Sequence, residues 1–403
     1  MDIPMISPLR PYAATKISSR KFRRNGRIYG TMSDMKLDNP FLIRGYAGPE
    51  YFCDREAETR QLVSAISNGR DVTLVAPRRY GKTGLVHNAF QILEKDHATV
   101  YLDIFALEDL TSFVQAFAAA VLDRLDSTAE RVGRKLLSFF KSCRPTLTPK
   151  DDGSFAFSFD IAPSQAKATL KDTFDYIASR RRKIAIAIDE FQQVREFPEK
   201  RTEALLRSYI QFVPNAHFVF VGSRKHMMDA MFVSPKGPFY QSTQLMALGP
   251  IDAGKYEEFS ARFFRGDRRS FSSEAFHHLY DRFNGITWYV QAILNRVWMH
   301  GGGLDSAKQV DDTVNELVAE AEPFYFDLLR SQTAAEQSIL KAVGKEGVAA
   351  SISGCDFIRR NALPAASTVR SAAAKLTERD LLYRTDAGHV VYDRFFGIWL
   401  KRL

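Results

Sequence analysis

Hydrophobic residues in the first 250 positions form short apolar runs, separated by segments in which apolar positions recur at helical spacing. The apolar runs span 72–75, 100–105, 184–188 and 218–221. The helical patterns span 56–68, 84–95, a segment ending at Leu122, and 203–212. Apolar runs with little polar alternation are typical of strands buried on both faces. The alternation predicts an α/β fold, in which helices cover both faces of a parallel sheet.

Residues 144–163 break this alternation. Asp152-Gly153 precedes Phe155, Phe157 and Phe159, which alternate with small or polar residues, and this predicts a β-hairpin inserted into the sheet domain. The aromatic row could stack on nucleic-acid bases. One buried face of a hairpin is the commoner explanation, and we favour it.

After Pro250 the strand pattern stops. Helical patterns near 253–265, 273–283, 286–300 and 305–320 predict a small helical domain. Further helices at 334–343, 354–361 and 367–379, followed by two short strands around the turn at 385–388, predict a winged helix. The predicted divisions are a flexible basic leader (1–37), an α/β core (38–250), a helical domain (251–330) and a winged helix (331–403).

Composition is that of a globular protein of two or three domains: 403 residues, 45% apolar and 26% charged. No apolar stretch is long enough to span a membrane, and the first residues lack a secretory signal, so we expect a cytoplasmic protein. Cys53, Cys143 and Cys355 lie too far apart for a metal-ligand motif and are expected to be reduced thiols.

The net charge of +9 permits an acidic partner such as nucleic acid without requiring one. One basic cluster, 16–27, lies in the leader. It could bind nucleic acid or anionic lipid, but a solvated tail is the commoner explanation for such a cluster, and we favour it.

The most informative segment follows the run 72–75. A loop ending in Gly81-Lys82-Thr83 opens a helix, which is typical of a phosphate-binding loop. Lys82 would bind the β- and γ-phosphates, and the Thr83 hydroxyl would bind Mg²⁺. Ala76 stands where the motif has glycine, and only this residue favours the alternative of a degenerate loop without nucleotide. The candidate nucleotide-binding residues are Ala76, Pro77, Arg78, Arg79, Tyr80, Gly81, Lys82, Thr83 and Gly84.

A second acidic motif follows the run 184–188. Asp189 would bind Mg²⁺, mainly through water, and Glu190 would act as general base on an attacking water. Alone, this pair is compatible with a solvated strand end. Together with Lys82 and Thr83 upstream, it predicts a site for ATP and Mg²⁺, with Thr83 and Asp189 as the metal ligands.

These motifs resemble the archaeal-type ATPase family of P-loop NTPases, which is allied to AAA+ and STAND proteins, and the resemblance covers about residues 38–403. The family often has Pro-Arg-Arg in the variable loop positions, as at 77–79, and tolerates a first residue other than glycine. The resemblance implies an AAA+-like core, with 251–330 as a helical lid and 331–403 as a winged helix.

The resemblance also assigns residues outside the two motifs. Asn39-Pro40-Phe41 and the segment 51–58 together resemble the family's opening motif, which lies beside the adenine and ribose in relatives. This implies roles for Arg55, Glu56 and Glu58. Asp54 replaces a glycine of that motif and could instead cap a helix. Arg224 follows the run 218–221 and matches the sensor-1 position, where arginine faces the γ-phosphate and stabilises its transferring charge.

The expected lid motif departs from the family pattern. Thr287 replaces its proline, no arginine occupies the expected position, and Arg296 lies further along the helix. Trp288 and Tyr289 are expected in the core. An AAA+ ring would also require an arginine acting on a neighbouring subunit, for which Arg201, Arg207 and Arg224 are candidates.

The sequence therefore predicts an ATP-binding protein in which Mg²⁺-dependent hydrolysis, with Lys82, Glu190 and Arg224 in catalytic roles, drives a conformational switch. The alternative is a nucleotide-gated DNA-binding regulator with little turnover. DNA would be bound by the leader or by the helix 367–379, through Arg370, Lys375 and Arg379. The rival role for the winged helix is to pack on the core and report nucleotide state. A protein partner or a homo-oligomer stays open.

Overall fold

The computed structural model describes residues 37–125, 140, 142, 145–149 and 155–403. It also describes two short strands within the basic cluster, β1 (Arg23–Arg24) and β2 (Arg27–Ile28), which pair antiparallel. The rest of the predicted leader lies outside the described residues.

A five-stranded sheet forms the first domain, with the strand order β4-β7-β8-β3-β9, and all of its strand pairings are parallel. The strands are β3 (Val72–Val75), β4 (His97–Asp103), β7 (Lys183–Asp189), β8 (Ala216–Gly222) and β9 (Gln244–Ala247). The four predicted strands are present. The pattern missed β9, because an edge strand of four residues carries too few buried positions to stand out.

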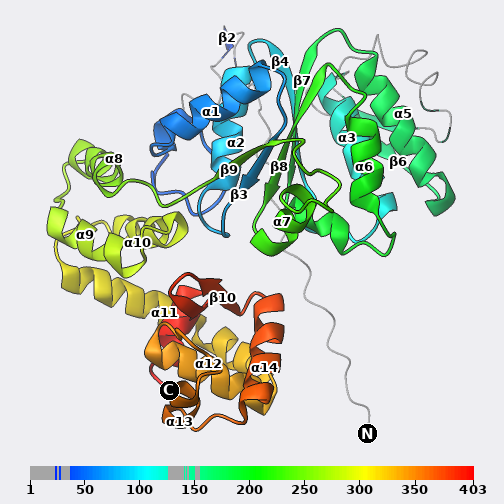
Figure 1. Ribbon diagram of the computed structural model, residues 1–403. Helices are drawn as coiled ribbons and strands as arrows, with labels where there is room; N and C mark the ends of the chain where they lie inside the picture. Colours follow the sequence, from blue (N-terminus) through cyan, green and yellow to red (C-terminus); the bar gives the residue numbers. More distant parts are fainter. Residues whose placement is uncertain are drawn as a thin grey trace, which may run out of the picture.

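Helices cover both faces of this sheet (Figure 1). One face is covered by α1 (Glu56–Ser67) and α2 (Lys82–Leu93), and the other by α3 (Leu110–Leu125), α5 (Ala166–Ala178), α6 (Thr202–Ile210) and α7 (Lys225–Phe232). Alternate residues of strand β7 pack against the two helical layers. Its isoleucines at 184, 186 and 188 pack towards α3 and α5, whereas Ala185 and Ala187 pack towards α1 and α2. Every residue of the strand after Lys183 is buried, as a doubly covered parallel strand requires.

The hairpin insertion consists of β5 (Pro145–Pro149) and β6 (Phe155–Phe159), paired antiparallel. Phe157 and Phe159 are buried in the same core as α3, and the Phe159 ring lies 5.2 Å from that of Phe140. The favoured prediction of a buried hairpin face is confirmed for these two side chains.

The rest of the chain is mainly helical. It begins with α8 (Ala253–Gly266), α9 (Ser273–Arg282), α10 (Thr287–Met299) and α11 (Ala307–Arg330). Helix α11 continues well past the predicted end at 320 and joins the helical domain to the C-terminal domain (Figure 1). The C-terminal domain contains α12 (Ala334–Glu346), α13 (Cys355–Arg360), α14 (Ala366–Glu378), β10 (Leu382–Thr385), β11 (Gly388–Val391) and α15 (Arg394–Leu400). Its helices and hairpin form the predicted winged helix.

The helical domain and the winged helix share one hydrophobic core. Phe395 of α15 lies 5.5 Å from the ring of Phe283 and 5.0 Å from that of Tyr289. These two domains therefore form one packed unit, against which Tyr80 of the loop between β3 and α2 also packs.

Two further sequence features can be located. The thiol of Cys53 is buried, that of Cys355 is exposed, and both are free. Within the described ranges, no helix combines the length and the apolar character needed to cross a membrane.

The turn between β10 and β11 depends on Gly388. Its φ is 136°, and an added Cβ would lie 2.3 Å from the carbonyl oxygen of Ala349. We expect Gly388→Ala to lower the free energy of unfolding by about 2 kcal/mol, from backbone strain and overpacking. Chemical denaturation measures this loss. In the control Gly266→Ala, the added Cβ has no atom within 4 Å, so equal losses for both variants would contradict the steric explanation.

Candidate functional site

The loop between β3 and α2 has the backbone of an anion-binding turn. Gly81 precedes α2 with φ 85° and ψ 21°, and an added Cβ there would meet nothing within 4 Å. The left-handed backbone, rather than lack of space, therefore requires glycine at this position. The loop brings its N–H groups to the N-terminus of a twelve-residue helix, where the helix dipole also favours an anion.

Ala76 fits the first loop position without distortion. Its φ is not positive, and its N–H extends the pairing of β3 by donating to the Gly222 carbonyl at 3.3 Å. The methyl group is buried in the core beneath α1 and α2. The structure therefore supplies a physical reason why alanine can replace glycine here.

Lys82 is held beneath the loop. Its ammonium donates to the carbonyl oxygens of Ala76 at 2.9 Å and Pro77 at 3.1 Å, and its side chain is 6% exposed. Burial lowers the pKa of Lys82, while the carboxylates of Glu190 and Asp189 act in the opposite direction. A buried ammonium group that is hydrogen-bonded to loop carbonyls can exchange these partners for the oxygens of a phosphate.

The N-terminus of α2 and the C-terminal ends of β4 and β7 lie close together at Asp189. Thr83 Oγ1 donates to Asp189 Oδ2 at 2.8 Å, and the Tyr101 hydroxyl donates to the same oxygen. Asp103 lies opposite Asp189 in the strand register, and burial, with Asp189 and Glu190 nearby, raises the pKa of the Asp103 carboxyl. The hydroxyl and carboxylate oxygens gathered here are ligands that Mg²⁺ prefers. No sequence motif identified Tyr101 as a site residue. Its position near the end of β4, the strand beside β7, was the signal available.

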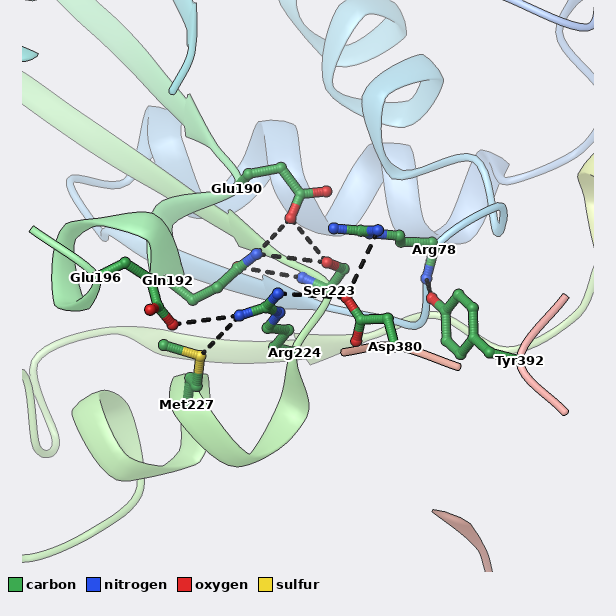
Figure 2. Close-up of polar contacts among 9 residues, drawn as sticks. All are labelled: Arg78, Glu190, Gln192, Glu196, Ser223, Arg224, Met227, Asp380 and Tyr392. Carbon is green, nitrogen blue, oxygen red and sulfur yellow. Dashed lines mark hydrogen bonds and ion pairs between the residues drawn. The ribbon is translucent and has the colours of Figure 1, made fainter. Parts of the chain in front are cut away.

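Glu190 is fixed by two residues that the sequence did not single out. Its Oε2 accepts a hydrogen bond from Ser223 Oγ at 2.7 Å and a short one from Gln192 Nε2 (Figure 2). Ser223 follows β8 directly, so the end of β8 is tied to the end of β7. Its position directly after β8 and before Arg224 was the signal that the sequence offered.

Arg224 lies beside this cluster, at the residue before α7. Its guanidinium contacts Glu196 Oε1 at 3.2 Å and Asp380 Oδ2 of the winged helix at 3.4 Å (Figure 2). Arg224 and Glu190 therefore lie at the same end of the sheet, where the parallel strands have their C-termini. The predicted contact with a γ-phosphate stays a prediction.

The opening segment divides into a buried and an exposed part. Arg55 is buried, pairs with Glu58 at 2.8 Å, and donates to the carbonyl oxygens of Gly249 at 2.6 Å and Tyr80 at 3.5 Å. It therefore contacts the phosphate-binding loop. Glu56 is 61% exposed and lies 3.5 Å from Lys255.

The alternative role for Asp54 as a helix cap is wrong. Helix α1 begins at Glu56, so Arg55 is the capping residue, with φ 70° and no side-chain cap. Asp54 is itself left-handed, with φ 52°, and its carboxylate accepts from Lys255 at 2.7 Å instead. Two consecutive left-handed residues carry the carboxylate away from the amides of the first turn.

The helical domain, which the family resemblance identifies as a lid, contacts the phosphate-binding loop through Arg79 of the loop. The Arg79 guanidinium lies 4.4 Å from the ring of Trp288, bonds to the Tyr289 hydroxyl, and pairs with Asp393 at 3.0 Å. The backbone N–H of Trp288 also donates to the Arg79 carbonyl at 3.1 Å. Arg296 pairs instead with Glu316 and Glu320. Tyr289 is buried as predicted, whereas Trp288 is only partly buried.

The neighbouring Arg78 contacts the winged helix. Its backbone N–H donates to the Tyr392 hydroxyl at 3.0 Å, and its guanidinium lies 3.6 Å from Asp380 Oδ2 (Figure 2). The sequence could not signal Asp380, Tyr392 or Asp393, since each lies about three hundred positions from its partner in the loop.

This fold and loop geometry define a P-loop ATPase with a C-terminal winged helix. A family model described as "ATPase domain predominantly from Archaea" matches residues 52–293, more than half of the chain. A second, described as "Probable winged helix domain", matches residues 323–402. The chain therefore belongs to this archaeal-type ATPase family, and the predicted family and fold class are confirmed.

Solved structures show the same fold. The Walker-type ATPase paby2304 of Pyrococcus abyssi is 16% identical with a TM-score of 0.61, over 90% of this chain and 100% of that one. The ORC2 protein of Aeropyrum pernix, solved in ADPNP-ADP complexes, is 15% identical with a TM-score of 0.55, over 90% and 95%. The ORC1 protein of Aeropyrum pernix, solved with DNA, is 12% identical with a TM-score of 0.51, over 91% and 97%. No curated protein matches the chain.

The environment of Ala76 leads to a test. Ala76→Gly removes a buried methyl group and frees the backbone, so we expect the free energy of unfolding to fall by about 1 kcal/mol. ATP affinity, measured by calorimetry, should stay within about threefold, because the loop already has its working backbone. A large gain in affinity would contradict this and would identify Ala76 as a defect.

Proposed function

We propose that this chain binds ATP with Mg²⁺ and hydrolyses it, and that hydrolysis drives a conformational switch. The observation that carries the proposal is the 2.8 Å hydrogen bond from Thr83 to Asp189. It joins the end of the phosphate-binding loop to the end of β7, where the hydroxyl and carboxylate could hold a divalent cation. Bound Mg²⁺ would neutralise phosphate charge during transfer.

The protein's own groups then divide the work. Lys82 and the N–H groups of 77–84 would bind the phosphates, and Arg55 and Glu56 would lie towards the nucleoside. Glu190 would take a proton from the attacking water, and its bonds to Ser223 and Gln192 would orient the carboxylate. Arg224 would stabilise negative charge on the transferring group.

The contacts of Arg78 and Arg79 support the switch. Both residues belong to the loop that would bind phosphate, and both contact the lid or the winged helix. A change in what the loop holds would therefore bias the positions of those domains.

Two substitutions test hydrolysis. Lys82→Ala should weaken ATP binding by about 10- to 100-fold, through loss of charged hydrogen bonds. Glu190→Gln should retain ATP binding but slow phosphate release by about 100-fold or more, through loss of the general base. Calorimetry measures binding, and single-turnover phosphate release measures hydrolysis.

Matched surface variants serve as controls for these substitutions. Lys95→Ala and Glu258→Gln change the same residue types at exposed positions and should behave as the wild type. Equal phosphate release by the wild type, Lys82→Ala and Glu190→Gln would refute the proposed site.

A second candidate function is nucleotide-gated DNA binding by the winged helix. Arg370 and Lys375 of α14 are exposed, as a helix that enters a DNA groove requires. Arg379 is instead engaged within the domain, where it bonds to Gln332 at 3.1 Å and pairs with Glu336 at 3.6 Å. The ORC1 structure with DNA supports this candidate by likeness of fold alone.

We expect the double substitution Arg370→Ala/Lys375→Ala to weaken duplex binding and to reduce the salt slope of the affinity by about 2, one unit for each lost phosphate contact. Fluorescence anisotropy over a salt series measures both quantities. The control Lys341→Ala/Lys345→Ala removes two exposed charges from α12 in the same domain. Equal slopes for the two double variants would exclude α14 as the DNA contact.

A further inference from the structure

One carboxylate of the winged helix lies between two arginines of the ATPase core. Asp380, in the turn between α14 and β10, places Oδ2 3.6 Å from Arg78 Nη1 and 3.4 Å from Arg224 Nη2. Figure 2 shows both guanidinium groups directed at this carboxylate, with Glu190 directed towards the same region from the end of β7.

The two arginines come from the parts of the core that would surround the terminal phosphate. Arg78 lies in the phosphate-binding loop, and Arg224 follows Ser223, which holds Glu190 at 2.7 Å. Guanidinium groups bind carboxylates and phosphates with the same donors. Asp380 therefore pairs with two guanidinium groups to which a triphosphate could also bind.

Tyr392 takes up a third group of the loop. Its hydroxyl accepts from the backbone N–H of Arg78 at 3.0 Å, and such loop N–H groups are the ones that bind phosphate oxygens in this class of site. Burial raises the pKa of Tyr392 to about 12, so the group stays a neutral phenol. The winged helix thus supplies one anion and one neutral acceptor to Arg78.

The other acidic contact is of a different kind. Asp393 pairs with Arg79, whose guanidinium is stacked on Trp288 of the lid and bonds to Tyr289. This pair fastens the loop to the lid and the winged helix, but Arg224 takes no part in it. Asp393 therefore offers a matched comparison, as a docking carboxylate that pairs with Arg79, whereas Arg224 pairs with Glu196 and Asp380.

We propose that Asp380 stands in for the γ-phosphate, and so determines how the site discriminates between nucleoside triphosphate and diphosphate. The inference rests on the proposed nucleotide site and deepens it. A triphosphate must displace the Asp380 carboxylate from Arg78 and Arg224 in order to bind them. A diphosphate ends before this position and leaves the contact intact, so the winged helix stays docked.

The variant that tests this should fold. Asp380 adopts a left-handed conformation, with φ 56°, which asparagine adopts readily. Asp380→Asn keeps the size of the side chain and removes only its charge. Asp393→Asn does the same at the docking pair and keeps an oxygen for the N–H groups of Phe395 and Phe396 that Asp393 now caps.

The experiment titrates the full-length wild type and both variants with Mg·ADP and with a non-hydrolysable Mg·ATP analogue. Asp380→Asn should bind the analogue about 10-fold more tightly and should bind ADP within about twofold of the wild type. Asp393→Asn should change both affinities by the same factor. In the wild type, the analogue but not ADP should increase amide hydrogen exchange across 380–393.

Each other outcome has a definite meaning. If Asp380→Asn shifts the two affinities equally, Asp380 is a docking residue only, and the inference is overturned while the nucleotide site stands. If the analogue leaves exchange across 380–393 unchanged, displacement of Asp380 is refuted. If the wild type binds neither nucleotide, the proposed function fails first and the inference with it.

Discussion

The structure depends on how the two arginines of the phosphate-binding loop are held. Arg78 and Arg79 project from one short turn, together with the buried Lys82 beneath it, so three cations lie close together. Asp380 and Asp393 of the winged helix supply the opposing charge, and the aromatic residues of the lid supply a stacking surface. Like charges so close together require such partners. Through these partners, three parts of the chain meet at one loop.

The polar contacts and the apolar contacts of the winged helix have different roles. Its ion pairs with the core are partly exposed, and pairs of this kind contribute about 0–1 kcal/mol each. Its contact with the lid is instead a continuous hydrophobic core that includes Phe283, Tyr289 and Phe395. The lid and the winged helix are therefore joined firmly to each other, while weaker, charge-dependent contacts, together with the packing of Tyr80, join this unit to the loop. An anionic ligand can compete with the second kind of contact but not with the first.

Within the site, the sequence predicted the residues whose role follows from local backbone chemistry. Gly81, Lys82 and Thr83 lie where a helix begins after a buried strand, and Asp189 and Glu190 lie where the predicted strand 184–188 ends. Ser223, Gln192 and Tyr101 were missed, because each side chain contacts a residue at the end of a neighbouring strand: Glu190, Ser223 and Asp189, respectively. From the sequence alone, Ala76 raised the question whether the loop is intact. The structure shows that its backbone φ is ordinary and its methyl group is buried, so alanine fits this position.

The sequence by itself determined the α/β class, four strands of the sheet, the winged helix and the phosphate-binding loop, because hydrophobic periodicity and short motifs encode local structure. It did not single out β9, α5 or α7. Only the tertiary structure decided that Arg79 contacts Trp288 and Tyr289 of the lid and that Asp380 contacts Arg78 and Arg224. Arg78 and Tyr392 are 314 positions apart, and no local pattern specifies such a pair. Their meeting results from the packing of whole domains, which depends on the shape and charge of surfaces assembled from distant segments.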